Sequence, residues 1–199
     1  SRWIDRTTSF EGVPAGGIAV GNFWPSNFGM DHLVAVREVG GQVTMYVYEP
    51  PQHFAVRQWT QRSVSNPVSI NGTFLGATGG NPRAATKDQL LIATEYDGNI
   101  RITMLNPPST SSGTTWSKLA ESDLPNVQGT FVAFACGDFW GEKKDYVVMA
   151  TSVGGATRIV FYRYTAAGNR FDFVVDDRAP DLPTLLPGGM CVADYQKDG

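Results

Sequence analysis

Residues 88–93 read Asp88-Gln-Leu-Leu-Ile-Ala93, an aspartate that stands just before an apolar run. The same pattern occurs 57 residues earlier as Asp31-His-Leu-Val-Ala-Val36, and 57 residues later as Asp145-Tyr-Val-Val-Met-Ala150. Two further sets of residues keep this spacing: Gly41, Gly98 and Gly155, and Trp59, Trp116 and Phe173. A long internal period of this kind is typical of repeat architectures, in which each repeat is one supersecondary unit.

Each repeat is predicted to hold four short strands. In the first repeat these strands are residues 17–23, 32–37, 43–48 and 54–59. Val43, Met45 and Val47 alternate with polar or aromatic neighbours, which is the period of a half-buried strand. Tight two-residue hairpins are predicted at three pairs that tolerate a positive φ angle: Gly40-Gly41, Asp97-Gly98 and Gly154-Gly155.

The predicted fold class is all-β: a β-propeller of four-stranded antiparallel blades, with 57 residues per blade. The three full blades are residues 13–66, 67–124 and 125–182. Residues 1–12 are predicted to be the outer strand of a preceding blade, because Trp3-Ile-Asp-Arg6 resembles Trp59-Thr-Gln-Arg62. Residues 183–199 begin a fourth blade. The chain 1–199 is therefore interpreted as part of one propeller domain.

Three blades cannot close a ring, and the open blade edges would leave backbone hydrogen-bonding groups unpaired. We therefore expect a companion polypeptide, or a further part of the same product, to complete the propeller. A two-fold dimer of this chain fits less well. Where two copies met, the outer strand of one and the first strand of the other would form a blade that still lacks two of its four strands. The first residue is Ser1, without a preceding Met or an apolar leader, which fits a mature or excised segment.

Composition excludes several classes of function. The chain has 42% apolar and 18% charged residues and a net charge of −3, without a basic run that would indicate nucleic-acid binding. No apolar stretch approaches the ~18 residues of a membrane span.

His32 and His53 lack partners at metal-ligand spacing and are interpreted as surface residues. Cys136 and Cys191 fall one residue out of register in equivalent strands, which predicts two buried free thiols rather than a disulfide.

In the first, third and fourth repeats the first strand ends in a related motif: Val20-Gly-Asn-Phe23, Cys136-Gly-Asp-Phe139 and Val192-Ala-Asp-Tyr195. With the aspartate that precedes each second strand, this motif resembles the FG-GAP/VCBS repeat of integrin-α-like β-propellers. The resemblance covers nearly the whole chain. It implies a seven-bladed ring, of which this chain would be about half, and it implies an extracellular, secreted protein that binds glycans or proteins.

The same resemblance implies Ca²⁺ as a cofactor, held by oxygen ligands in the loop after the first strand. In blades one to three the ligand pattern is incomplete, and we interpret Asp31, Asp88 and Asp145 as residues that cap turns. The fourth blade reads Asp194-Tyr-Gln196-Lys-Asp198, which matches the first, third and fifth ligand positions of the family. The metal ligands that the resemblance implies are therefore Asp194, Gln196 and Asp198.

Aromatic residues and one sequon supply the remaining candidate sites. Phe23 and Phe139 recur in register, which indicates packing between blades, and Trp24 and Trp140 follow them directly. Trp side chains stack on sugars and anchor interfaces, so these two tryptophans are the candidate ligand-binding residues, with cover of blade edges as the alternative. Asn71-Gly72-Thr73 is an N-glycosylation sequon, with Asn71 as the acceptor.

No catalytic constellation is recognised in the sequence, since it lacks a serine-hydrolase elbow, a phosphate-binding loop and a metal-ligand cluster. The predicted function is a non-catalytic, lectin-like binding module that recognises a glycan or protein through the loops between blades, residues 61–69, 121–128 and 176–187. Two alternatives stay open. One is part of a secreted polysaccharide lyase or hydrolase whose active site lies mostly outside this segment, and the other is a purely structural half-propeller.

Overall fold

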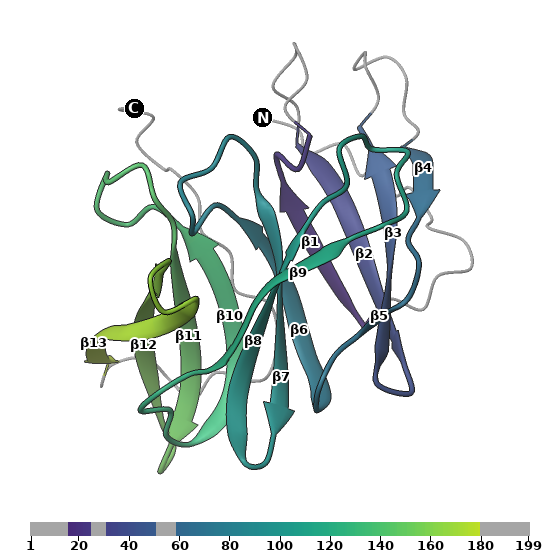
Figure 1. Cartoon of the computed structure of the whole chain (residues 1–199). Coiled ribbons are helices and arrows are strands. Elements are labelled where there is room, and N and C mark those ends of the chain that lie inside the picture. The colour runs from purple at the N-terminus through teal and green to yellow at the C-terminus, as the bar shows by residue number, and fades with distance from the viewer. Residues whose placement is uncertain (1–15, 25–30, 51–58, 180–199) are drawn as a thin grey trace, which may run out of the picture.

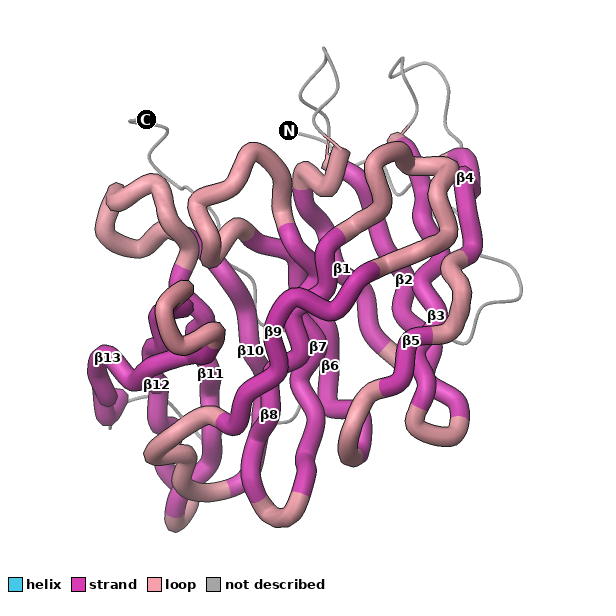
Figure 2. The backbone as a smooth tube through the Cα atoms, in the orientation of Figure 1, coloured by secondary structure: helices cyan, strands magenta, loops and turns pink. Residues whose placement is uncertain are grey.

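The computed structural model describes residues 16–24, 31–50 and 59–179. Within these residues the chain is all-β, with strands joined by turns and loops and without a helix (Figure 2). The strands form three antiparallel sheets in succession along the chain (Figure 1). This confirms the predicted all-β class and the predicted four-stranded antiparallel units. The three sheets do not close a ring within the described residues.

The first sheet has the order β1-β2-β3-β4, and its strands are β1 (Gly17–Gly21), β2 (His32–Val39), β3 (Gln42–Glu49) and β4 (Thr60–Val64). A fifth strand, β5 (Val68–Ser69), also pairs with β3. Pro67 has no backbone N–H to give to the sheet, and it lies where the outer strand is interrupted between β4 and β5. The predicted fourth strand, residues 54–59, lies mostly outside the described residues. β4 begins directly after Trp59.

The other two sheets repeat the arrangement. The second has the order β6-β7-β8-β9, with β6 (Thr73–Gly80), β7 (Gln89–Tyr96), β8 (Asn99–Asn106) and β9 (Ser117–Asp123). The third has the order β10-β11-β12-β13, with β10 (Thr130–Gly137), β11 (Tyr146–Val153), β12 (Ala156–Thr165) and β13 (Arg170–Ala179). The first strands β1, β6 and β10 lie side by side, as β9 does with β13.

Tight hairpins join the second and third strand of every sheet at the predicted positions. The φ angles are +62° and +78° at Gly40 and Gly41, and +49° and +74° at Asp97 and Gly98. Positive φ at both central residues is the geometry of a two-residue turn that matches the twist of the strands. The three hairpins lie at the lower end of Figure 1, and the loops that follow β6 and β10 lie at the upper end.

Each sheet has two faces. We call the face that points to the preceding sheet the front face, and the face that points to the following sheet the back face. One buried cluster joins the back face of the first sheet to the front face of the second; its members include Val34, Val36, Met45, Val47, Leu90, Ile92 and Trp116. A second cluster joins the second sheet to the third; its members include Leu91, Ala93, Ile102, Met104, Phe134, Val147, Met149 and Tyr162. Successive residues of β7 alternate between the two clusters, because side chains of a strand alternate between faces.

Glycine allows the first strands to approach closely. A Cβ atom at Gly79 would overlap the carbonyl oxygen of Val20 in the neighbouring strand β1. A Cβ atom at Gly80 would overlap the sulfur of Cys136 in β10. Any side chain at these two positions would push the sheets apart, so the packing of β1, β6 and β10 depends on glycine in β6.

Candidate functional site

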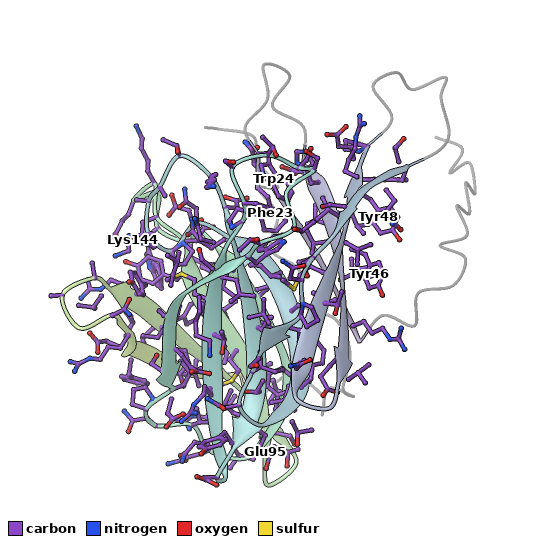
Figure 3. The ribbon with its side chains drawn as sticks, turned by 45° about the vertical axis from the view of Figure 1, so that its right-hand side comes forward. Phe23, Trp24, Tyr46, Tyr48, Glu95 and Lys144 are labelled. Atoms are coloured by element: carbon purple, nitrogen blue, oxygen red, sulfur yellow. The ribbon has the colours of Figure 1, made fainter. Side chains whose placement is uncertain are left out.

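Trp24 lies in the joint between the first and second sheets and follows β1. It is 8% exposed, and its indole N–H donates to the carbonyl of Pro108 over 2.7 Å. Its ring packs edge-on against Trp116, with 5.8 Å between the ring centroids, beside the fully buried Phe23 (Figure 3). The indole ring is therefore buried between the two sheets, and its N–H group is already used as a hydrogen-bond donor within the protein. This arrangement fits the alternative given above, cover of a sheet edge, better than stacking on a ligand.

Trp140 occupies the equivalent place after β10 and is exposed. Its relative exposure is 49%, and that of Phe139 is 38%. The ring of Trp140 lies 4.3 Å from Tyr146 and 5.3 Å from Phe161, measured between centroids. This packing holds the indole at a fixed angle while half of its surface faces solvent. Among the described residues, Trp140 is therefore the candidate tryptophan that remains accessible.

The repeated aspartates join neighbouring sheets through their side chains. The Asp88 carboxylate accepts the backbone N–H of Asn22 over 2.6 Å, and the N–H of Asp88 donates to the carbonyl of Asn22 over 3.0 Å. Asp145 makes the same pair of contacts with Asn81, at 2.6 Å and 3.3 Å. We call these two-way contacts the aspartate joints. Asp88 and Asp145 were interpreted as residues that cap turns; they do bind backbone N–H groups, but those groups follow the first strand of the preceding sheet.

The carboxyl groups of the aspartate joints have shifted pKa values. Burial raises the pKa of Asp88 and of Asp145 above the ordinary value of an aspartate, and the hydrogen bond from the neighbouring N–H lowers it in part. Burial also raises the pKa of the Cys136 thiol, and the nearby Asp145 and Asp88 carboxylates add to the effect. Cys136 is a free thiol, as predicted, and it is partly buried; Cys191 lies outside the described residues.

The loop from Asp138 to Asp145 does not fit a calcium ion. The two carboxylate oxygens of Asp138 accept the backbone N–H groups of Glu142, at 3.0 Å, and Lys143, at 2.7 Å. Glu142 in turn accepts the hydroxyl of Tyr146 over 2.5 Å. The acids of this loop thus hold protein donors rather than converge on a common point. The ligands implied by the family resemblance, Asp194, Gln196 and Asp198, lie outside the described residues, and no group of three potential metal ligands occurs within them.

An ion cluster that the sequence analysis missed surrounds Glu49 at the end of β3. The carboxylate of Glu49 binds the Arg62 guanidinium at 2.6 Å and accepts the Ser111 hydroxyl at 2.9 Å. His32 Nε2 lies 4.0 Å from the same carboxylate. His32 was predicted to be a surface residue, and this was wrong: it is 4% exposed, because its side chain points from β2 into the joint with Trp24.

The chemistry of this cluster is structural. Burial alone would raise the pKa of Glu49, but the hydrogen bonds from Arg62 and Ser111 outweigh burial and lower it. Burial lowers the pKa of His32, and the neighbouring Glu49 and Asp31 carboxylates oppose this in part. The Ser111 hydroxyl and the Arg62 guanidinium both donate to Glu49, so this carboxylate holds two segments of the chain together. The cluster therefore links the first sheet to the loop that precedes β9.

The loop between the second and third sheets is held in place by the third sheet. The hydroxyl of Tyr162 donates to the carbonyl of Pro125 over 3.2 Å, and Arg158 donates to the carbonyl of Asn126 over 3.1 Å. Leu124 is buried in the second cluster, and Val127 packs against it. The side chains of Asn126 and Gln128 are exposed. The loop thus presents polar groups to solvent from a fixed backbone, as functional loops on rigid scaffolds do.

Asn71, the acceptor of the sequon, lies in the exposed turn between β5 and β6. Its side-chain amide donates to Glu121 of β9 at 3.3 Å. Glu121 also receives Lys118 at 3.0 Å and the hydroxyl of Thr103 at 3.2 Å. The amide nitrogen that would carry a glycan is thus at the surface, and it forms only long hydrogen bonds, to one carboxylate. Glycosylation of Asn71 stays a prediction.

Comparison with known proteins leaves the family open. No protein-family model matches the chain, and no curated protein matches it either. The resemblance to FG-GAP/VCBS repeats therefore stays a prediction. Within the described residues, no helix has the length and apolar character needed to cross a membrane.

Proposed function

We propose that the chain is part of a β-propeller and acts as a non-catalytic binding module for a glycan or protein ligand. In this proposal the three sheets are successive blades, because their first strands lie side by side and the aspartate joints repeat from sheet to sheet. Further blades, from a companion polypeptide or the same product, would complete the ring. The resemblance to FG-GAP/VCBS repeats implies that such a protein is extracellular.

The observation that carries this proposal is the anchored loop of residues 124–129. Its carbonyl groups are bound by Tyr162 and Arg158, while Asn126 and Gln128 are exposed. A loop that is ordered before binding loses less conformational entropy when a ligand binds, which favours affinity. Amide side chains supply both donors and acceptors, and these suit sugar hydroxyl groups or a peptide backbone.

The segment between the first two sheets is anchored in a similar way. The N–H of Asn66 donates to the carbonyl of Thr114 over 2.8 Å, and Ser65 binds the backbone of Met45 in both directions. Asn66 and Asn71 are exposed. The turn between β5 and β6 and the loop between β9 and β10 lie with the three hairpins at the lower end of Figure 1.

A glycan array followed by titration calorimetry tests the proposal. We expect the unmodified chain to bind at least one glycan without releasing reducing ends, and the double variant Asn126→Ala/Gln128→Ala to lose that binding. Ser112→Ala, an exposed substitution in the loop that precedes β9, serves as the matched control and should bind as the parent does. Release of reducing ends from a polysaccharide would instead support the enzyme alternative. Binding that survives the double variant would exclude this loop.

A further inference from the structure

The turn that carries Asn71 lies directly on the hairpin between β7 and β8. Gly72 has a φ angle of +97°, and a Cβ atom there would overlap the carbonyl oxygen of Glu95 and lie 3.0 Å from the Cβ of Tyr96. Asn71, Glu95 and Tyr96 are all exposed. Because only glycine fits at position 72, the backbone beside the acceptor asparagine lies close against a hairpin that presents an aromatic side chain.

The ring of Tyr96 is held in place although the residue is 37% exposed. The guanidinium of Arg101 lies over the ring, 4.0 Å from its centroid. Arg101 in turn donates two hydrogen bonds to the carboxylate of Asp123, at 2.6 Å and 3.1 Å. One face of the ring is therefore occupied within the sheet, and its exposed part forms a small aromatic platform next to Gly72.

The acceptor amide lies on the same face of the second sheet as this ring. Asn71 donates to Glu121 of β9, and Tyr96 is linked through Arg101 to Asp123 of the same strand. Glu121 and Asp123 are two residues apart, so their side chains point to the same face of the strand. A sugar attached to Asn71 therefore begins on the face of the sheet that carries the ring.

We propose that the first sugar of an N-linked glycan on Asn71 packs on the ring of Tyr96 and stabilises the contact between this turn and the hairpin. Attachment forms a bond between Nδ2 of Asn71 and C1 of a sugar supplied by a lipid diphosphate-linked oligosaccharide; the amide gives up one proton, and the lipid diphosphate leaves. The second amide hydrogen remains available for Glu121. Contact between the apolar face of the sugar and the ring removes apolar surface from water. This inference rests on the predicted glycosylation and is independent of the proposed binding function.

The joint between the second and third sheets repeats the turn without the aromatic ring. Gln128-Gly129-Thr130 stands 57 residues after Asn71-Gly72-Thr73. A Cβ atom at Gly129 would overlap the carbonyl oxygen of Ser152, and Val153 takes the place of Tyr96. The substitution Gln128→Asn therefore creates the same sequon beside an aliphatic side chain, and it is the matched control for the ring.

Thermal unfolding of the full chain, secreted from a eukaryotic host, tests the contact. Intact mass establishes the occupancy of Asn71, and an endoglycosidase then trims the glycan to its first N-acetylglucosamine. Thr73→Ala removes the sequon and keeps Asn71, so it serves as the unmodified reference. We expect the trimmed chain to melt about 2–4 °C above this reference.

Substitutions of Tyr96 show whether the ring causes this difference. In the Tyr96→Val background the difference between the trimmed chain and its Thr73→Ala reference should disappear. Tyr96→Phe keeps the ring and should retain it. Because the same reference substitution is made in every background, its own effect on stability cancels.

Three results would overturn the proposal. An unmodified Asn71 in the secreted chain would show that the acceptor is not used. An equal gain in the Tyr96→Val background would show that the sugar does not pack on the ring. An equal gain from a glycan introduced by Gln128→Asn, with Thr130→Ala as its reference, would show a general effect of glycans on the unfolded chain. If Tyr96→Val does not fold, the comparison between positions 71 and 128 decides the matter by itself.

Discussion

Phe23-Trp24 and Phe139-Trp140 are the same motif in two different surroundings. Both pairs follow the first strand of a sheet, and both tryptophans pack on the first residue of the second strand, His32 in one case and Tyr146 in the other. The first pair is buried under Trp116 and Pro108 of the second sheet. The second pair is exposed on 38–49% of its surface. A repeated residue therefore has a fixed place in its own sheet, while the following sheet decides whether it belongs to a core or a surface.

The largest expected difference between the two regions concerns stability. Trp24→Ala removes a buried ring and leaves a cavity, so it should lower the free energy of unfolding by about 3–5 kcal/mol. Trp140→Ala removes a half-exposed ring at the equivalent position and should cost about 1 kcal/mol or less. Urea denaturation of both variants gives the comparison. Equal losses would indicate that Trp140 is covered in solution, for instance by an associated chain.

The aspartate joints give the next largest difference. Asp88→Ala and Asp145→Ala leave the N–H groups of Asn22 and Asn81 without their acceptor, and each should lower the free energy of unfolding by about 1–3 kcal/mol. Asp31→Ala changes the same repeat position where the side chain is exposed, and should stay within about 0.5 kcal/mol of the parent. Chemical denaturation of the three variants measures this. A large loss from Asp31→Ala would mean that Asp31 also forms a joint, with a sheet that precedes the first.

The repeat spacing predicted much of the fold, because it reflects the strands and hairpins within a single sheet. The hairpins at Gly40-Gly41 and Asp97-Gly98 follow from local backbone preference, and the apolar runs of the second strands follow from burial on both faces. These features depend on residues that are close in the sequence. They could therefore be recognised from the sequence alone.

Contacts between sheets could not be predicted in the same way. Asp88 was interpreted as a residue that caps a turn, and the structure gives it an acceptor role toward Asn22, which is 66 residues away. His32 was placed on the surface because it has no partner at metal-ligand spacing, yet its burial depends on Trp24 and on the second sheet. The 57-residue spacing of the aspartates was the signal that could have indicated a joint. It marks equivalent positions but does not say which groups meet.

The smallest expected effect is a dependence of stability on pH, and two acids of the first joint should give opposite signs. The pKa of Asp88 is raised by burial, so the folded chain binds this proton more tightly than the unfolded chain, whose value is 3.8. Its contribution to stability is thus fully present below the unfolded value and is lost as the pH rises through the folded pKa. The pKa of Glu49 is lowered by Arg62 and Ser111 despite its burial. Its contribution is present above the unfolded value of 4.5 and is lost as the pH falls.

Asp88→Asn and Glu49→Gln separate these two contributions, because each removes one titration and keeps a side-chain oxygen as an acceptor. The free energy of unfolding of each variant is measured by urea denaturation from pH 7 into the acid range and subtracted from that of the parent. The difference for Asp88→Asn should grow in favour of the parent as the pH falls, and the difference for Glu49→Gln should shrink. If the two differences changed with pH in the same direction, the pKa values of Asp88 and Glu49 would not be shifted in opposite directions, and the assignment would be wrong.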